Sequence, residues 1–108
     1  MTYRPLDERL TIGKSVIHGQ GLIAIADIPA NENLGVSHVI IDSRIVRTPM
    51  GGFVNHQDEP NCRLKVGTLP KNDEDFHMYD YECKYLWTSR EIKAGEELTV
   101  KYKMYDPT

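Results

Sequence analysis

Short apolar stretches separated by turn-forming residues run along the chain, which is typical of strands rather than helices. Residues 10–12 and 16–17 predict a first pair of strands, broken near Gly13-Lys14. Three further strands are predicted over residues 21–26, 34–41 and 63–68. Because no amphipathic helix of ten or more residues appears, the pattern predicts a mainly β protein with little helix.

The region from His77 to Trp87 alternates with a period of two, which predicts one strand, or two because eleven residues is long for one. One face carries His77, Tyr79, Tyr81, Cys83, Tyr85 and Trp87, and the other carries Met78, Asp80, Glu82, Lys84 and Leu86. The aromatic face fits either a packed sheet or a stacking platform for nucleic-acid bases. The acidic balance of the chain favours the packed sheet.

The segments between the predicted strands carry residues that interrupt regular structure. Pro29 and two asparagines mark residues 27–33 as a turn. Pro49 and a pair of glycines block a long element in residues 42–52, which we expect to be irregular. Residues 70–75 are predicted to form a polar loop.

One short sequence occurs twice. The pattern Ile-x-Ala-x-Glu-x-Leu stands at residues 28–34 and again at residues 92–98, each time between two apolar stretches. We predict a repeated strand–turn–strand unit, in which the isoleucine fills the core and the leucine re-enters the sheet. The Ala-Asn or Ala-Gly pair between them makes the turn.

Length and composition restrict the class of protein. The chain has 108 residues and 12.4 kDa, with 40% hydrophobic and 27% charged residues, which predicts one globular domain. Its net charge of −3 provides no basic surface for nucleic acid. No apolar run is long enough to span a membrane, and the N-terminus lacks the apolar segment of a signal peptide. We therefore expect a cytoplasmic, or otherwise intracellular, protein that binds neither membrane nor nucleic acid directly.

Two smaller features of the composition concern partners and metals. Five acidic side chains lie within ten positions: Asp73, Glu74, Asp75, Asp80 and Glu82. They are interpreted as a solvated loop and strand edge, and the alternative is an attraction for a basic partner peptide. Cys62 and Cys83 belong to no CxxC pair, so we predict two buried free thiols and no structural zinc site.

Three local motifs carry candidate chemistry. They are His18-Gly19-Gln20-Gly21, Gly52-Phe53-Val54-Asn55-His56-Gln57-Asp58-Glu59-Pro60-Asn61-Cys62, and Gly95-Glu96-Glu97-Leu98-Thr99-Val100-Lys101-Tyr102. The glycines of the first fit a tight turn or a close approach of backbone to a ligand. The amides of the second either brace irregular backbone or hold a polar ligand. The third is a short apolar segment that ends in a tyrosine.

In this order, the three motifs resemble those of the SET domain of protein lysine methyltransferases, over about residues 9–102. The resemblance implies small curled β-sheets, with the Asn-His segment threaded beneath the C-terminal segment as a pseudoknot. It also implies a single SET domain over residues 1–108, without a pre-SET or a zinc-binding post-SET module. The short insert at residues 42–51 makes the chain similar to the minimal stand-alone SET proteins of viruses and bacteria, which would act in the host cell if viral.

The resemblance further implies S-adenosylmethionine as methyl donor, with S-adenosylhomocysteine as product and no metal. The implied cofactor-binding residues are His18, Gly19, Gln20, Gly21, Asn55 and His56. Tyr102 matches the catalytic tyrosine, which orients the amine of the lysine. Val100 stands at the position that influences how many methyl groups are added, and Tyr85 and Tyr105 are further candidates for the substrate channel.

We therefore predict a protein-lysine N-methyltransferase whose partner is a protein or peptide that bears a lysine. The alternative is a SET-like module that binds peptide or cofactor without turnover. A nucleic-acid binder is disfavoured by the charge. We also expect a homodimer with its contact near the C-terminal strand, and the competing state is a monomer whose site closes when Tyr105 and the peptide order together.

Overall fold

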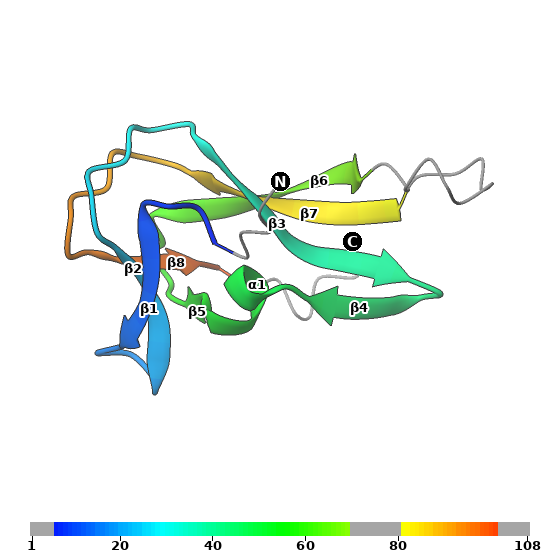
Figure 1. The fold of residues 1–108 in the computed structure, drawn as a ribbon, viewed down its shortest axis with the longest axis horizontal. Helices are drawn as coiled ribbons and strands as arrows, with labels where there is room; N and C mark the ends of the chain where they lie inside the picture. The colour runs from blue at the N-terminus through cyan, green and yellow to red at the C-terminus, as the bar shows by residue number, and fades with distance from the viewer. Residues whose placement is uncertain (1–5, 70–80, 102–108) are drawn as a thin grey trace.

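The computed structural model describes residues 6–69 and 81–101, which form strands and one short helix (Figure 1). The strands are β1 (Leu10–Lys14), β2 (Gln20–Ala24), β3 (Asn33–Ile41), β4 (Arg44–Arg47), β5 (Asn55–His56), β6 (Cys62–Leu69), β7 (Tyr81–Thr88) and β8 (Glu97–Val100), and the helix is α1 (Pro49–Phe53). The prediction of a mainly β fold with little helix is confirmed. None of the helical structure in the described ranges is long and apolar enough to cross a membrane.

The strands form two small sheets, which lie in different parts of the molecule (Figure 1). Their orders are β1-β2-β8-β5 and β4-β3-β7-β6. In the first sheet β8 pairs antiparallel with β2 and parallel with β5, although β5 and β8 are far apart in sequence. The late strand β8 is thus inserted between two earlier segments, as the predicted pseudoknot requires.

The two copies of the repeat pair with each other. Ile28 and Ile92, the first residues of the two copies, each donate a backbone hydrogen bond of 2.8 Å to the carbonyl of the other. Both side chains are fully buried. Figure 1 shows the two connecting loops lying side by side at one end of the molecule. The prediction that the isoleucines fill the core is confirmed.

The turns of the two copies are equivalent as well. Gly95 donates its N–H to the carbonyl of Ala24 at 2.7 Å, and Asn31 donates its N–H to the carbonyl of Thr88 at 3.0 Å. Ala24 and Thr88 each stand four residues before the isoleucine of their copy, and Asn31 and Gly95 each stand three residues after it. Asn31 has a φ of 61° and Gly95 a φ of 94°, and asparagine and glycine tolerate this left-handed region best. The repeat is therefore an approximate internal two-fold symmetry.

The hydrophobic core draws on both sheets and on α1. Its buried members are Leu10, Leu22, Ala24, Ile28, Leu34, Met50, Val54, Cys62, Leu86, Ile92, Leu98 and Val100. Val100, placed in the substrate channel by the resemblance, is fully buried within this cluster. Cores of this kind supply most of the stability of a small domain.

The prediction of a strand at Val16-Ile17 is wrong. These residues form the tip of the β1–β2 hairpin, and their exposed fractions are 99% and 42%. The hairpin turns here because Ser15 donates its N–H to the carbonyl of Gly19 at 2.9 Å, which closes a short loop. Apolar side chains at such a tip have no sheet to pack against.

The prediction that residues 42–52 are irregular is also wrong in part. Asp42 and Ser43 adopt φ values of 50° and 64° and reverse the chain into β4, which pairs with β3. Helix α1 then begins at Pro49, with Thr48 as its N-cap. The proline and glycines do prevent a long element, since α1 has only five residues.

Strands predicted over residues 34–41 and 63–68 are confirmed as β3 and β6. The strand predicted over residues 21–26 ends two residues early, at Ala24. The alternating region is confirmed as β7 from Tyr81 onward, and residues 77–80 lie outside the described residues.

On the aromatic face of β7, Tyr85 and Trp87 are partly buried and contact the neighbouring strand β6. The Lys65 Nζ lies 4.4 Å from the centroid of the Trp87 ring. The ring of Tyr85 lies against Gly67, and its hydroxyl donates to the carbonyl of Thr68 at 2.8 Å. These contacts favour the packed sheet over a stacking platform for bases.

Both cysteines are free and buried, as predicted. Burial raises the pKa of the Cys62 thiol to about 12. Because the thiolate is the reactive and metal-binding form, the raised pKa disfavours reaction and metal binding at Cys62 at neutral pH.

Candidate functional site

The three sequence motifs meet at β8, because this strand lies between β2 and β5. β2 begins at Gln20, inside the glycine motif, and β5 is the Asn-His pair. Along β8 the core takes Leu98 and Val100, so the alternation of a strand places Glu97 and Thr99 on the opposite face. These two polar side chains are the centre of the site.

The loop of the glycine motif is held by Ser15. Its Oγ accepts hydrogen bonds from the N–H groups of Ile17, at 2.9 Å, and His18, at 3.1 Å. The loop closes at Gly19, whose φ of 49° lies in the left-handed region. Ser15 is nearly fully buried, so the loop has a defined conformation rather than being an open turn.

Glu97 joins this loop to the Asn-His segment. The Ser15 hydroxyl lies 2.8 Å from both carboxylate oxygens of Glu97, and the Asn55 Nδ2 donates to Oε2 at 2.9 Å. Gly21 lies directly beside them, and a Cβ at this position would collide with the Glu97 carboxylate and lie 3.0 Å from Asn55 Nδ2. A larger residue at Gly21 would therefore displace the Glu97 carboxylate from its position beside Asn55.

The Asn55 amide is surrounded by acceptors. Besides Glu97, its Nδ2 lies 3.2 Å from the carbonyl of His18, 3.1 Å from that of Gln20 and 3.1 Å from the Ser15 Oγ. An amide has two hydrogens for these four acceptors. We call the side chains of Ser15, Asn55 and Glu97, with the carbonyls of His18 and Gln20, the polar cluster. It has more acceptors than donors.

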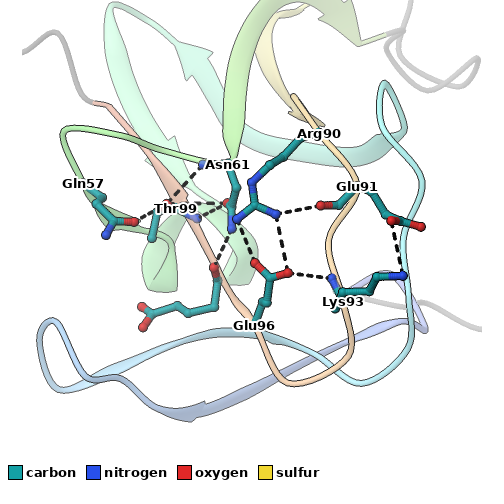
Figure 2. Close-up of polar contacts among 8 residues, drawn as sticks. Gln57, Asn61, Arg90, Glu91, Lys93, Glu96 and Thr99 are labelled. Atoms are coloured by element: carbon teal, nitrogen blue, oxygen red, sulfur yellow. Dashed lines mark hydrogen bonds and ion pairs between the residues drawn. The ribbon is translucent and has the colours of Figure 1, made fainter.

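A second set of amide contacts fastens the Pro-Asn part of the motif to β8 (Figure 2). Asn61 donates from Nδ2 to the carbonyl of Glu97 at 2.8 Å and accepts from the N–H of Thr99 at 2.8 Å. The Thr99 hydroxyl donates to Gln57 at 3.0 Å, and the N–H of Gln57 donates to the carbonyl of Val100 at 2.9 Å. The prediction that these amides brace irregular backbone is confirmed.

Glu96, next to Glu97, belongs to a different network (Figure 2). Arg90 donates to its Oε2 at 2.8 Å, and the N–H of Lys93 donates to its Oε1 at 2.9 Å. The Arg90 hydrogen bond lowers the pKa of Glu96 below its ordinary value. Lys93 in turn lies 3.3 Å from Glu91. Glu96 is therefore an ion-paired carboxylate of the second repeat, outside the polar cluster.

The structure brings the predicted cofactor residues together at β8. His18, Gln20 and Asn55 are members of the polar cluster. Gly19 provides the left-handed turn of its loop, and Gly21 lies against Glu97 and Asn55. His56 pairs with Val100, and its ring lies 3.4 Å from Asp58. Their roles toward a cofactor stay predictions.

The predicted channel and catalytic residues are placed differently. Tyr85 lies on β7 of the other sheet, and no hydrogen bond among the described residues joins it to the polar cluster. Tyr102 and Tyr105 lie outside the described residues. Their assignments stay predictions.

Sequence reasoning missed two residues of the cluster, Ser15 and Glu97. Glu97 had a signal, because it stands within the third motif and alternates with two core residues of β8. Ser15 had only a weak signal, since serine commonly accepts backbone hydrogen bonds at the start of a tight turn.

A family model of SET domains matches residues 36–103, more than half of the chain. The chain belongs to the SET domain family. A solved structure of Plasmodium falciparum, described as a candidate histone methyltransferase, superposes on this SET domain with a TM-score of 0.68 and 18% identity. The match covers 87% of this chain and 96% of that chain. A search of curated proteins found no match.

These comparisons confirm the resemblance to the SET domain family and the small-sheet SET fold. At 18% identity, the likeness to the Plasmodium structure shows the fold alone. The narrower resemblance to minimal SET proteins of viruses and bacteria stays a prediction.

Proposed function

We propose that this SET domain is an S-adenosylmethionine-dependent methyltransferase that acts on the side-chain amine of a lysine in a protein. The observation that supports this most is the polar cluster, where all three family motifs meet around one carboxylate. Family membership supports methyl transfer as the reaction class.

The residues present fit the amino-acid end of this cofactor. S-adenosylmethionine carries a primary ammonium group, which has three N–H donors and no acceptor. The polar cluster offers the complement, because the carbonyls of His18 and Gln20 and the Glu97 carboxylate compete for the two hydrogens of Asn55. The close approach at Gly21 leaves no side chain between β2 and these acceptors.

In this reaction the chain's own groups have mainly positioning work. When bound, S-adenosylmethionine supplies an electrophilic methyl group on a sulfonium. Ser15 of the hairpin loop and Glu97 of β8 contact each other, and Asn55 of β5 donates hydrogen bonds to both. The lysine amine must arrive neutral, although its ordinary pKa is about 10.4. Tyr102, assigned from the motif, is expected to orient the lone pair of that amine.

Two variants test the division of roles. Tyr102→Phe should lower turnover strongly with little change in cofactor affinity, since its hydroxyl acts at the reacting centre. Asn55→Ala should instead weaken cofactor binding, because its amide no longer holds Glu97 and the carbonyls of His18 and Gln20 in place. Calorimetry with S-adenosylhomocysteine and transfer of a labelled methyl group into lysate proteins measure the two effects. An equal loss of cofactor affinity in both variants would contradict this assignment.

The same experiment separates the enzyme from the alternative. Measurable cofactor binding without any labelled protein would support a SET-like binding module. Absence of cofactor binding by the wild-type chain would overturn both.

A further inference from the structure

Glu97 differs from the other carboxylates of its segment in having no cationic partner among the described residues. Glu96 is paired with Arg90 at 2.8 Å, and Glu91 with Lys93 at 3.3 Å. Glu97 is partly buried, and within residues 6–69 and 81–101 its side chain accepts only from the Ser15 hydroxyl and the Asn55 amide. A partly buried carboxylate without a cation favours a positively charged ligand.

The position of Glu97 also determines which end of the Asn55 amide faces inward. With Nδ2 inward, the amide donates toward Glu97 and the carbonyls of His18 and Gln20. If the amide were turned over, Oδ1 would meet the same three acceptors without a hydrogen between them. The carboxylate thus holds the amide with its own acceptor, Oδ1, directed away from the cluster.

We propose that Glu97 is a positioning residue that sets the polarity of this site. It orients the Asn55 amide and supplies the negative charge, so that the site selects ligands carrying a primary ammonium group. This inference rests on the proposed function and adds to it the residue that decides amine selectivity. The three donors of an ammonium match the surplus of acceptors in the polar cluster.

The test compares two ligands that differ only in this group. S-adenosylhomocysteine and its analogue without the α-amino group are titrated into the full chain by calorimetry. Wild type should bind the parent about 10- to 100-fold more tightly than the deaminated analogue, the range expected for hydrogen bonds to a charged group. Glu97→Gln should reduce this ratio about tenfold or more, almost entirely through weaker binding of the parent.

Glu96→Gln is the matched control, because it makes the same chemical change at the adjacent residue outside the polar cluster. It should leave both affinities within about twofold of wild type. Ser15→Ala is a second variant should Glu97→Gln fail to fold. It keeps the charge of Glu97 but removes one of its holders, so it should reduce the same ratio by a smaller factor.

The outcomes are distinguishable. Failure of the wild type to bind S-adenosylhomocysteine would contradict the proposed function itself. Binding by the wild type with equal losses for both ligands in Glu97→Gln would overturn the inference alone, since a merely structural carboxylate affects both ligands alike. A ratio unchanged in both Glu97→Gln and Ser15→Ala would also overturn it.

Discussion

Replacing Asn61 by alanine should destabilise the whole domain, because one side chain there completes the pairing of an irregular segment with β8. Asn61 is 5% exposed, and its amide satisfies the Glu97 carbonyl and the Thr99 N–H, each at 2.8 Å. Alanine removes the donor and the acceptor together. Both backbone groups then lose their partners at the crossing of the segment with β8.

The magnitude follows from these two groups. A buried donor or acceptor left without a partner costs about 1–3 kcal/mol, so Asn61→Ala should cost about 2–6 kcal/mol. Domains of this size have a free energy of unfolding of about 5–15 kcal/mol. A loss of about 3 kcal/mol would lower Tm by about 10–25 °C. Gln57→Ala is the control, because Gln57 is exposed and water can replace its contact with Thr99.

Urea denaturation followed by tryptophan fluorescence measures the effect, with Trp87 as the single tryptophan of the chain. This probe lies on β7 in the other sheet, so it reports global unfolding rather than a change at the mutated segment. Gln57→Ala should stay within about 0.5 kcal/mol of wild type. Equal and small losses in the two variants would show that the Asn61 amide does not hold the crossing.

Three further results are expected. Cys62 and Cys83 should not react with a thiol reagent at neutral pH in the folded protein, and two thiols should titrate in denaturant, since both are buried and the pKa of Cys62 is raised to about 12. Burial lowers the pKa of His38, so the unfolded chain takes up this proton first. The free energy of unfolding should therefore fall as pH drops below about 6.5, and His38→Gln should flatten that slope in denaturation series. Gly21→Ala should weaken binding of S-adenosylhomocysteine in calorimetry, whereas Gly52→Ala, where a Cβ meets open space, should not.

Local patterns predicted the parts of the fold that depend on local chemistry. The alternation of β7 reflects the two faces of a strand, so it could be read without knowing the neighbours. The repeat could also be predicted from the sequence, because an isoleucine, a turn pair and a leucine at fixed spacing define the same loop twice. What these patterns could not show is that Ile28 pairs with Ile92, which is a contact between distant segments.

The two errors in the predicted strands have different physical origins. Val16 and Ile17 have strong β propensity, yet they occupy a hairpin tip because Ser15 and Gly19 close the loop around them. β4 was missed for the opposite reason. All four of its residues are exposed, so it lacks the buried face that produces a recognisable pattern. Turn closure thus outweighs β propensity at Val16 and Ile17, whereas β4 forms a strand in keeping with the propensity of Ile45 and Val46.

Of the candidate site, the sequence predicted only the residues that the family motifs assign to the cofactor. Asn55 and the glycines came from the family resemblance, and the structure places them around β8. Ser15 and Glu97 needed the fold, because their contact joins residues from the two ends of the described chain. A polar side chain that looks like a solvated strand residue becomes part of a cluster only when β8 is placed between β2 and β5.

The internal symmetry explains where the site lies. Glu32 and Glu96 occupy equivalent positions in the two copies, and each forms an ion pair with an arginine. The next residue breaks the equivalence. In the first copy the Asn33 side chain accepts a hydrogen bond from the N–H of Gly35 at 2.9 Å, within its own strand. In the second copy Glu97, one methylene longer and charged, reaches the hairpin loop and the Asn-His segment. Stability is thus shared by both copies, whereas the candidate chemistry is confined to the one whose strand lies between two other motifs.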